Sequence, residues 1–429
     1  MRMLFVSNLY PPHHLGGYEL LCHEVATHLT ARGHEVAILT SDFGVKGPTP
    51  EPGVYRQLKL ASDIYYYRPQ QVLRYWADGR ANRQAIRKAL AETAPDVVVI
   101  WGMWNLSPLV AAWVERLAGH RVVYYLASQW PAEPTPHEAY WDGTANRLPG
   151  RLFKRLLRRP VRLALHREWR PYALRFEHVI ACSRFVRDGL VQAGVPVADA
   201  RIIYLGIDPV PYQEAAAQRE KAPPTQGLRV AYVGALVPHK GPHTAVEALG
   251  LLAGDGASRA VSLTILGSGH PEYEERLHAM VRRWKLEDKV TFQRPIPRAQ
   301  LPGFLARFDA LVMPSVWEEP LARISQEAMA SGLVLVATPT GGTPEILIDG
   351  ENGLAFAPED AHALAGHLRR LATDADLRRR LACEGRRTVL ERFTLSRMIG
   401  ELEAYLADVA AKGRLGAVSH EAPDAGPYR

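Results

Sequence analysis

The stretch that decides the fold class of this 429-residue chain is ALVMPSVWEEPLARISQEAMASG, residues 310–332. Its first part, ALVMPS, is an uncharged apolar run with the length of a buried strand. A helical pattern follows and stops at Gly332, a residue typical of helix ends. Because a buried strand followed by a helix is the repeating unit of proteins with parallel sheets, this stretch predicts an α/β fold.

The same unit recurs in two series along the chain. The strand-like runs of the first series are MLFVSN, HEVAILTS, PDVVVIW, RVVYYLA and EHVIACS, and those of the second are LRVAYVG, SLTILGSG, DKVTFQ, ALVMPS and VLVATP. Between them the pattern stops, and residues rich in Pro, Ala and polar side chains are typical of a linker. We therefore predict a first domain over residues 1–208, a linker over 209–227 and a second domain over 228–392.

The end of the chain has a different pattern. We expect residues 393–412 to form a helix that returns to the first domain. Residues 413–429 have little to bury and are expected to form a flexible tail.

Composition restricts the class of protein. The chain is 47 % hydrophobic, enough for two ordinary cores, and its three cysteines show neither disulfide nor metal spacing, which favours a reducing cytoplasm. One uncharged segment, Val97 to Val114, has the length of a membrane span. Glycine, asparagine, serine and proline interrupt its middle, so we interpret it as a buried strand over 97–101 and a helix from about Leu106.

The net charge of +7 is concentrated in one segment, residues 146–176, which holds ten Lys or Arg and a single acid, Glu168. Leucines and other apolar residues are interleaved with these charges. One interpretation is a solvated helical face. The other is an amphipathic patch that makes a peripheral contact with anionic lipid or grips an acidic acceptor. No nucleic-acid-binding motif accompanies the charge, which disfavours nucleic acid as a partner.

Two acids, Glu319 and Glu327, bracket the start of the helix in the opening stretch. We place Pro320 just inside this helix. Glu327 then borders the packed side, where a carboxylate must find donors. Glu319 precedes the helix, where free backbone amides attract anions. The pair suits a ligand with hydroxyls and phosphates, but a capping acid together with a core-edge glutamate explains it equally well.

Other candidate ligand residues also follow predicted strands. Lys240 lies in a turn that begins at Gly234 and can neutralise a phosphate. Gly16 and Gly17 precede a helix, where a backbone can approach a phosphate closely. Each of these signals is weak alone. The pair of acids at 374 and 376 is better explained by helix capping than by a metal, and we predict no metal site.

Taken together, these residues resemble glycosyltransferase family 4, whose GT-B architecture has two Rossmann-like domains with parallel sheets facing across a crevice. The most specific motif is EPLARISQE, residues 319–327. The supporting motifs are YPPHHLGGYELLCHEVATHLTARGHEV, VIACSRFVRDGL, YLGIDP, VGALVPHKG and PTGGTPEILIDGENGLAFAPED. The resemblance covers nearly the whole chain.

The resemblance implies residue roles. Glu319 would bind hydroxyls of the donor sugar, Glu327 the nucleotide ribose, and Lys240 the diphosphate. Gly16 and Gly17 would approach the diphosphate from the other domain. The crevice loop would be shaped by Gly341, Gly342 and Glu345.

The chain departs from the family pattern at two positions. The family often has arginine where this chain has Ala235, and Arg323 is the residue we expect to compensate. Ala127 and Ser128 stand where many members carry a first-domain histidine.

The implied activity is a retaining, metal-independent transfer of a hexosyl unit from a nucleotide diphosphate sugar to an acceptor hydroxyl. The expected donor is UDP- or GDP-linked, and no separate cofactor is expected. The acceptor is a saccharide, a lipid-linked molecule or a small molecule, and 65–78 and 130–150 are candidates for its surface. The alternatives are another GT-B enzyme, such as a phosphorylase or a sugar-nucleotide epimerase, and a non-catalytic sugar-nucleotide-binding protein.

Overall fold

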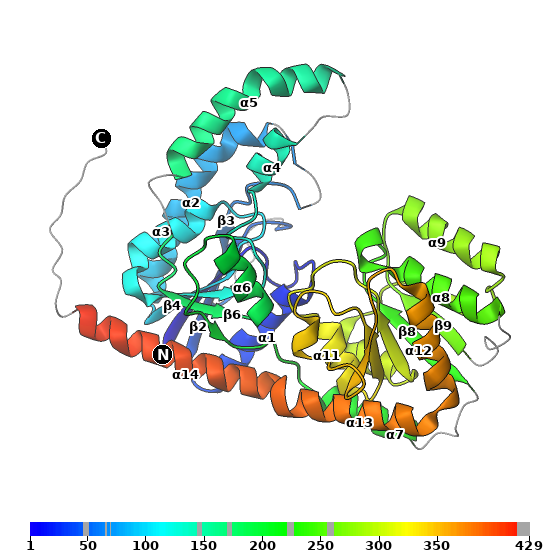
Figure 1. Ribbon diagram of the computed structural model, residues 1–429. Coiled ribbons are helices and arrows are strands. Elements are labelled where there is room, and N and C mark those ends of the chain that lie inside the picture. Colours follow the sequence, from blue (N-terminus) through cyan, green and yellow to red (C-terminus); the bar gives the residue numbers. More distant parts are fainter. Residues whose placement is uncertain are drawn as a thin grey trace. The chain divides into compact units, whose positions relative to one another are not determined.

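The computed structural model describes residues 1–45, 51–64, 67–68, 70–143, 148–169, 174–220, 227–254 and 261–417. These residues form two compact α/β units (Figure 1). Unit 1 comprises Met1–Ala181, Arg187–Ile203 and the chain from Ile399 on. Unit 2 comprises Cys182–Val186 and Tyr204–Met398.

Unit 1 is built on a seven-stranded parallel sheet with the order β3-β2-β1-β4-β5-β6-β7. Its central strands are buried, which explains why they are uninterrupted apolar runs in the sequence. The strands are β1 (Arg2–Ser7), β2 (Glu35–Ser41), β3 (Val54–Leu58), β4 (Val97–Gly102), β5 (Val122–Leu126), β6 (His178–Ala181) and β7 (Arg201–Ile202).

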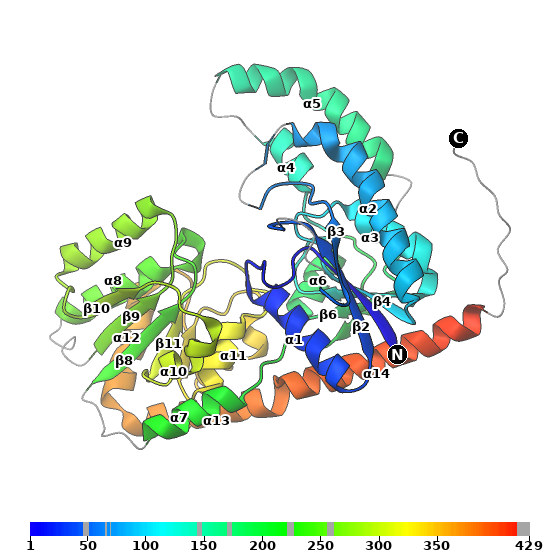
Figure 2. The ribbon, with the colours of Figure 1, turned by 180° about the vertical axis from the view of Figure 1, so that it is seen from behind.

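The helices that connect these strands include α5, which spans residues 148–169 of the basic segment. Both ribbon views show α5 beside α2 within unit 1 (Figures 1 and 2). The helices are α1 (Gly17–Ala31), α2 (Gln71–Thr93), α3 (Pro108–Ala118), α4 (Pro136–Asp142), α5 (Leu148–Trp169) and α6 (Arg184–Gln192). The first residues of α6, as far as Val186, belong to unit 2.

Unit 2 is built on a six-stranded parallel sheet with the order β10-β9-β8-β11-β12-β13. Strand β8 is central: Val230 pairs with Leu263 of β9 on one side and with Ala310 of β11 on the other. The strands are β8 (Leu228–Val233), β9 (Val261–Leu266), β10 (Val290–Gln293), β11 (Ala310–Met313), β12 (Val334–Ala337) and β13 (Gly353–Ala355).

The helices of unit 2 pack in two groups. One contains α8 (Pro242–Gly254), α9 (Pro271–Trp284) and α12 (Ala361–Thr373), whose buried side chains join those of the sheet in one core. The other contains α7 (Val210–Glu220), α10 (Leu301–Leu305), α11 (Arg323–Ala330) and α13 (Ala375–Arg392). Asp374 caps α13 by accepting from the Leu377 amide at 2.8 Å, as expected for this acidic pair.

The uncharged segment from Val97 to Val114 forms a strand and a helix, as predicted. Strand β4 is buried throughout, and α3 begins at Pro108 behind its cap, Ser107. Within the described residues, no helix is both long enough and apolar enough to cross a membrane.

The segment expected to be a linker contains a helix instead. Residues 210–220 form α7, which packs on α10 and α11. Its sequence, VPYQEAAAQRE, is rich in helix-forming Ala, Gln and Glu, and Tyr212 and Ala216 lie four residues apart and are both buried. Residues 221–226, the next part of the expected linker, lie outside the described residues.

The helix expected at residues 393–412 is α14 (Leu395–Ala417), which belongs to unit 1 from Ile399 on. Its Glu403 carboxylate accepts hydrogen bonds from Arg32 and from His34, both at 2.6 Å. The helix continues through residues 413–417, which we had expected to be part of a flexible tail. The rest of that tail, residues 418–429, lies outside the described residues.

Candidate active site

The sheet of unit 2 reverses its strand order between β8 and β11. The chain proceeds from β8 to β9 and β10 on one side, and from β11 to β12 and β13 on the other. Such a reversal is where open α/β sheets bind their ligands, beyond the carboxyl ends of the strands. Lys240 follows β8 and Glu319 follows β11, so the two residues flank this position.

Backbone contacts join the loops that follow β8 and β11. The amides of Val316 and Trp317 donate to the His239 carbonyl at 2.9 and 3.0 Å. Gly241 has a φ of +70°, and a Cβ there would lie 1.9 Å from the Pro314 carbonyl oxygen, so only glycine allows this approach. Lys240, between His239 and Gly241, is therefore held against the loop that carries Glu319.

The other expected glycine after β8, Gly234, ties this loop to β9. Its amide donates to the Leu266 carbonyl at 3.0 Å. A Cβ at Gly267 would lie 2.0 Å from the Gly234 carbonyl oxygen, so the two loops touch through their main chains. Gly234 therefore positions the loop that carries Lys240.

Lys240 and Glu319 form an ion pair at this edge of the sheet. The Ser315 hydroxyl donates to the same carboxylate oxygen, Oε1, at 3.1 Å. Glu319 is 9 % exposed, and the Lys240 side chain is 29 % exposed. The arrangement places a carboxylate, which can accept hydrogen bonds from hydroxyls, beside an ammonium, which can neutralise the charge of a phosphate.

The loop after β12 is packed against the backbone of Glu319. The Gly342 amide donates to the Glu319 carbonyl at 2.6 Å. Gly341 has a φ of +58°, and a Cβ on it would lie 2.2 Å from the same oxygen. A Cβ on Gly342 would lie 2.0 Å from the Pro320 carbonyl oxygen. Both glycines of the expected crevice loop therefore fix the main chain that carries Glu319.

These contacts explain why α11 begins later than predicted. Pro320 was expected inside the helix, but α11 begins at Arg323 with Ala322 as its cap. Because the Glu319 carbonyl is engaged by Gly342, residues 319–322 form a loop against the glycine turn.

We expect Gly341→Ala to lower the free energy of unfolding by about 2–4 kcal/mol, because it adds a backbone clash to the penalty for a positive φ. Gly350→Ala is the matched control: its φ is +73° and nothing lies within 4 Å of a Cβ there. In this control the free energy of unfolding should fall by only about 1–2 kcal/mol, because the substitution adds the positive-φ penalty without a clash. Urea unfolding measures both variants, and equal losses would show that the contact with Glu319 does not constrain the loop.

Glu327 lies on α11 and is only 2 % exposed, more deeply buried than the edge position predicted for it. It forms an ion pair with Arg298, from the short 3₁₀ turn Arg298–Gln300. Tyr212 of α7 lies beside this pair: burial first, and the Glu327 carboxylate second, raise the pKa of its phenol. The buried carboxylate has thus found the donor it needs, and the residue that supplies it was not predicted.

Arg323 is half-buried at the start of α11, in the surroundings of Glu327. With Arg298 it acts electrostatically on Tyr212, lowering the pKa of the phenol against the effect of burial. The Ala235 carbonyl accepts from the Tyr232 hydroxyl at 2.8 Å. The proposed compensation of Ala235 by Arg323 stays a prediction.

Glu345, expected in the crevice loop, caps a helix. Its carboxylate accepts from the amides of Arg184 and Phe185, both at 2.9 Å, at the start of α6. It also accepts from the Tyr204 hydroxyl at 3.0 Å. The bonds to these amides satisfy a helix terminus.

In unit 1, Gly16 and Gly17 stand at the start of α1, beyond the carboxyl end of β1. The Gly16 amide donates to the Glu19 carboxylate at 3.0 Å, so the helix carries its own acid in its first turn. Tyr18 holds this end of α1 to the sheet by donating to the carbonyls of Trp101 and Tyr125 at 2.7 and 2.8 Å. The expected approach of Gly16 and Gly17 to a diphosphate stays a prediction.

The two candidate acceptor segments lie together in unit 1. Tyr67 and His137 are 2.6 Å apart between hydroxyl and Nδ1, and the Tyr75 ring contacts the same histidine edge-on. Burial lowers the pKa of His137 to about 4, which leaves the imidazole neutral at pH 7. Residues 65, 66, 69 and 144–147 of these segments lie outside the described residues.

Among the residues that the structure describes, no group of three or more His, Cys, Asp or Glu side chains is placed to hold a metal ion. Cys22, Cys182 and Cys383 are free.

Ala127 and Ser128, which stand where many family members carry a histidine, follow β5 directly, at the carboxyl edge of the sheet of unit 1.

Comparison with protein families connects both units to one class of enzyme. Residues 15–210 match the model described as glycosyltransferase family 4, and residues 213–388 match that described as glycosyl transferases group 1. The chain belongs to the family 4 glycosyltransferases. The predicted family is therefore confirmed, and with it the prediction that the protein is a glycosyltransferase.

Similar proteins of known function agree with this assignment. The glycogen synthase of Mycobacterium tuberculosis strain H37Rv is 28 % identical over 446 residues, which cover 99 % of this transferase and all of that protein. A D-inositol 3-phosphate glycosyltransferase of Corynebacterium glutamicum is 28 % identical over 209 residues, 48 % of this chain and 49 % of its own.

Solved structures show the same fold at low identity. Sucrose-phosphate synthase from Thermosynechococcus elongatus has a TM-score of 0.69 at 21 % identity and covers 97 % of this chain and 99 % of its own. Anabaena HepE in complex with UDP and glucose has a TM-score of 0.64 at 20 % identity. The match covers 95 % of this chain and 99 % of the HepE chain. The transferase thus has the predicted GT-B fold of two Rossmann-like domains.

Proposed function

We propose that this glycosyltransferase moves a hexosyl unit from a UDP- or GDP-linked sugar to an acceptor hydroxyl, with retention at the anomeric carbon and without a metal ion. The observation that carries the proposal is the pair formed by Lys240 and Glu319 at the strand reversal of unit 2. The pair combines the two chemistries that a nucleotide diphosphate sugar presents, hydroxyls and phosphate charge.

In the proposed mechanism, unit 2 holds the donor. Glu319 accepts hydrogen bonds from sugar hydroxyls, and Glu327, oriented by Arg298, accepts them from the ribose. Lys240 and the backbone amides at the start of α11 face the diphosphate. Preorganised charge of this kind stabilises a leaving group most where it becomes negative in the transition state.

The chemical step exchanges one bond for another. The bond between the anomeric carbon and the diphosphate oxygen breaks, and a bond forms between that carbon and the acceptor oxygen on the same face of the sugar. The acceptor proton goes to the departing diphosphate, so that the step needs no protein nucleophile. Lys240 supplies positive charge where the diphosphate leaves.

The comparisons favour a nucleotide sugar as donor. HepE has been solved with UDP and with UDP-glucose. The names glycogen synthase and sucrose-phosphate synthase each give a saccharide as the product, and a saccharide is the acceptor class we propose first.

The test begins with thermal unfolding of the protein with UDP-, GDP-, dTDP- and ADP-sugars. A UDP- or GDP-sugar at about 100 times its Kd should stabilise the fold by about 2.7 kcal/mol. The stabilising donor, labelled in its sugar, is then incubated with saccharide acceptors, with and without EDTA. We expect a product of unchanged anomeric configuration, formed at the same rate in EDTA.

Other outcomes would replace parts of the proposal. Inversion at the anomeric carbon excludes retention, and loss of activity in EDTA excludes metal independence. Turnover that requires free phosphate indicates a phosphorylase, and donor conversion without any acceptor indicates an epimerase. No stabilisation by any of the four donors would contradict the donor site itself.

A further inference from the structure

Helix α5 presents a stripe of leucines to solvent. Leu152, Leu156 and Leu163 are 60 %, 75 % and 65 % exposed. At 100° per residue their side chains lie within about 40° of one another around the helix axis. The helix therefore carries an apolar face that nothing in unit 1 covers within the part of the chain described.

The opposite side of α5 holds the helix to unit 1. Leu165, about 140° or more from the leucine stripe around the axis, is buried. Lys154 lies on the same side as Leu165 and donates to the carbonyls of Tyr140 and Gly143. Between this side and the stripe, about 60° from Leu156, Phe153 contacts the ring of Trp141. Because these contacts fix the rotation of the helix, the stripe cannot turn inward without breaking them.

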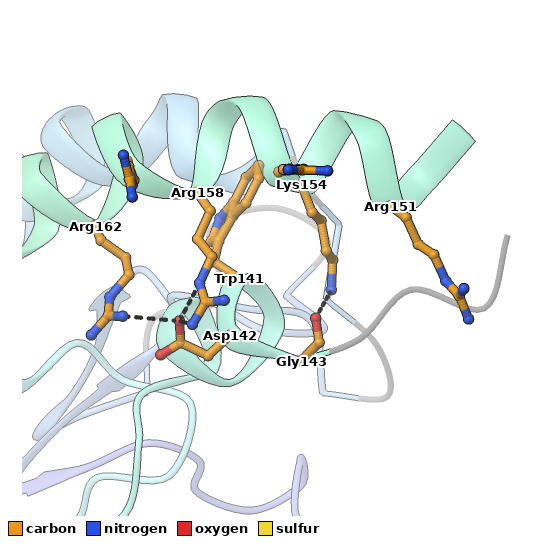
Figure 3. Close-up of a pocket in the computed structure, with 9 residues that line it drawn as sticks. Trp141, Asp142, Gly143, Arg151, Lys154, Arg158 and Arg162 are labelled. Atoms are coloured by element: carbon orange, nitrogen blue, oxygen red, sulfur yellow. Dashed lines mark hydrogen bonds and ion pairs between the residues drawn. The ribbon is translucent and has the colours of Figure 1, made fainter. Parts of the chain in front are cut away.

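A cationic groove runs along the same helix (Figure 3). It has a volume of about 440 Å³, and six of its nine lining residues are Lys or Arg, against one acid. That acid, Asp142 of α4, pairs with Arg158 at 3.0 Å and with Arg162 at 3.5 Å. The positive residues of the groove are Arg151, Lys154, Arg155, Arg158, Arg159 and Arg162.

The groove and the stripe are neighbours on the helix. Arg159 lies within about 20° of Leu152 around the axis, and Arg155 within about 60°. An approaching surface therefore meets leucines and arginines together. A soluble anion would satisfy the arginines and leave the leucines in water. A neutral apolar partner would cover the leucines and leave the charge uncompensated.

We propose that α5 docks this transferase on an anionic membrane surface. The three leucines of the stripe enter the boundary between headgroups and acyl chains, and the arginines beside them contact lipid phosphates. This combination of an apolar face with flanking cations is what binds helices in the plane of an anionic bilayer. The proposal is independent of the donor site, because its test measures binding alone.

The experiment is co-sedimentation of the full chain with vesicles, either phosphatidylcholine alone or with about 30 mol% phosphatidylglycerol, at about 0.1 M salt. One variant removes the apolar stripe by combining Leu152→Ser, Leu156→Ser and Leu163→Ser. The other removes positive charge beside the stripe by combining Arg155→Gln and Arg159→Gln. The charge control is Arg379→Gln with Arg387→Gln, on the exposed face of α13 in unit 2.

We expect the unaltered protein to bind the anionic vesicles and not the neutral ones. The arginine variant should bind about 25-fold more weakly, at roughly fivefold per charge. The leucine variant should bind the anionic vesicles at least about tenfold more weakly, because it no longer buries the apolar leucine side chains in the bilayer. The control variant, which changes the net charge equally, should bind as the unaltered protein does.

Several results would overturn the proposal. These are no binding to anionic vesicles, equal binding to neutral ones, or a leucine variant that binds normally. Sedimentation without vesicles tests a second copy of the chain as the occupant: self-association abolished by the leucine variant would replace the membrane. Circular dichroism of each variant shows whether it has folded, and a single Leu156→Ser change replaces the triple variant if that one has not.

Discussion

Lys240→Ala should lower kcat by about 10²–10³-fold, because the departing diphosphate loses the ammonium that compensates its charge. Lys240 is held in position by the loops after β8 and β11 and pairs with Glu319. A preorganised cation of this kind stabilises the transition state more than the bound donor. The loss should therefore be larger in kcat than in donor affinity, as measured by steady-state kinetics with the preferred donor.

Two further variants distinguish this role from a structural one. Lys240→Arg keeps the positive charge and should recover a substantial part of the lost kcat. Lys412→Ala removes an exposed lysine from α14 and should leave kcat unchanged. If the alanine variant turns over normally, or if only KM changes, Lys240 does not stabilise the leaving group.

Glu327→Ala should weaken binding of the preferred nucleoside diphosphate by about 10²-fold, because hydrogen bonds to a charged acceptor contribute about 1.5–3 kcal/mol each. The same change removes the partner of Arg298, so a stability effect must be separated from a ligand effect. Calorimetry with the nucleotide and with its 2′,3′-dideoxy form separates them. The unaltered enzyme should prefer the ribose form, and Glu327→Ala should lose that preference.

Arg298→Gln is the matched control for this experiment. It breaks the same ion pair and leaves the carboxylate in place, so it should weaken binding less and keep a preference for the ribose form. If Glu327→Ala still discriminates between the two nucleotides, the carboxylate does not bind the ribose. Its function would then be to hold Arg298 and Tyr212 together.

How much of the fold the sequence predicts depends on where a strand lies in its sheet. Central strands such as β4 and β11 are buried on both faces and appear as uninterrupted apolar runs. The strands that the sequence did not reveal, β3, β7 and β13, all lie at sheet edges, and β7 has only two residues. An edge strand that is short or partly exposed leaves no such run.

The candidate site was predictable where a residue follows a central strand. Lys240, Glu319 and the glycines at 341 and 342 were expected there, and the structure brings all four together in unit 2. Arg298 was not expected, because it lies in a short turn 29 residues before Glu327 with no motif around it. The cap that Glu345 provides at the start of α6 was not expected either, because Glu345 lies 161 residues after Arg184, whose amide it accepts from.

The division of the chain between the two units has a consequence for biosynthesis. Unit 1 takes its first strand from the start of the sequence and α14, with Glu403, from near its end. A chain made from its N-terminus therefore emerges with all of unit 2 before the last piece of unit 1 is available. Nascent chains stalled before Ile399 should carry unit 1 incomplete, with Arg32 and His34 still lacking the carboxylate that α14 supplies.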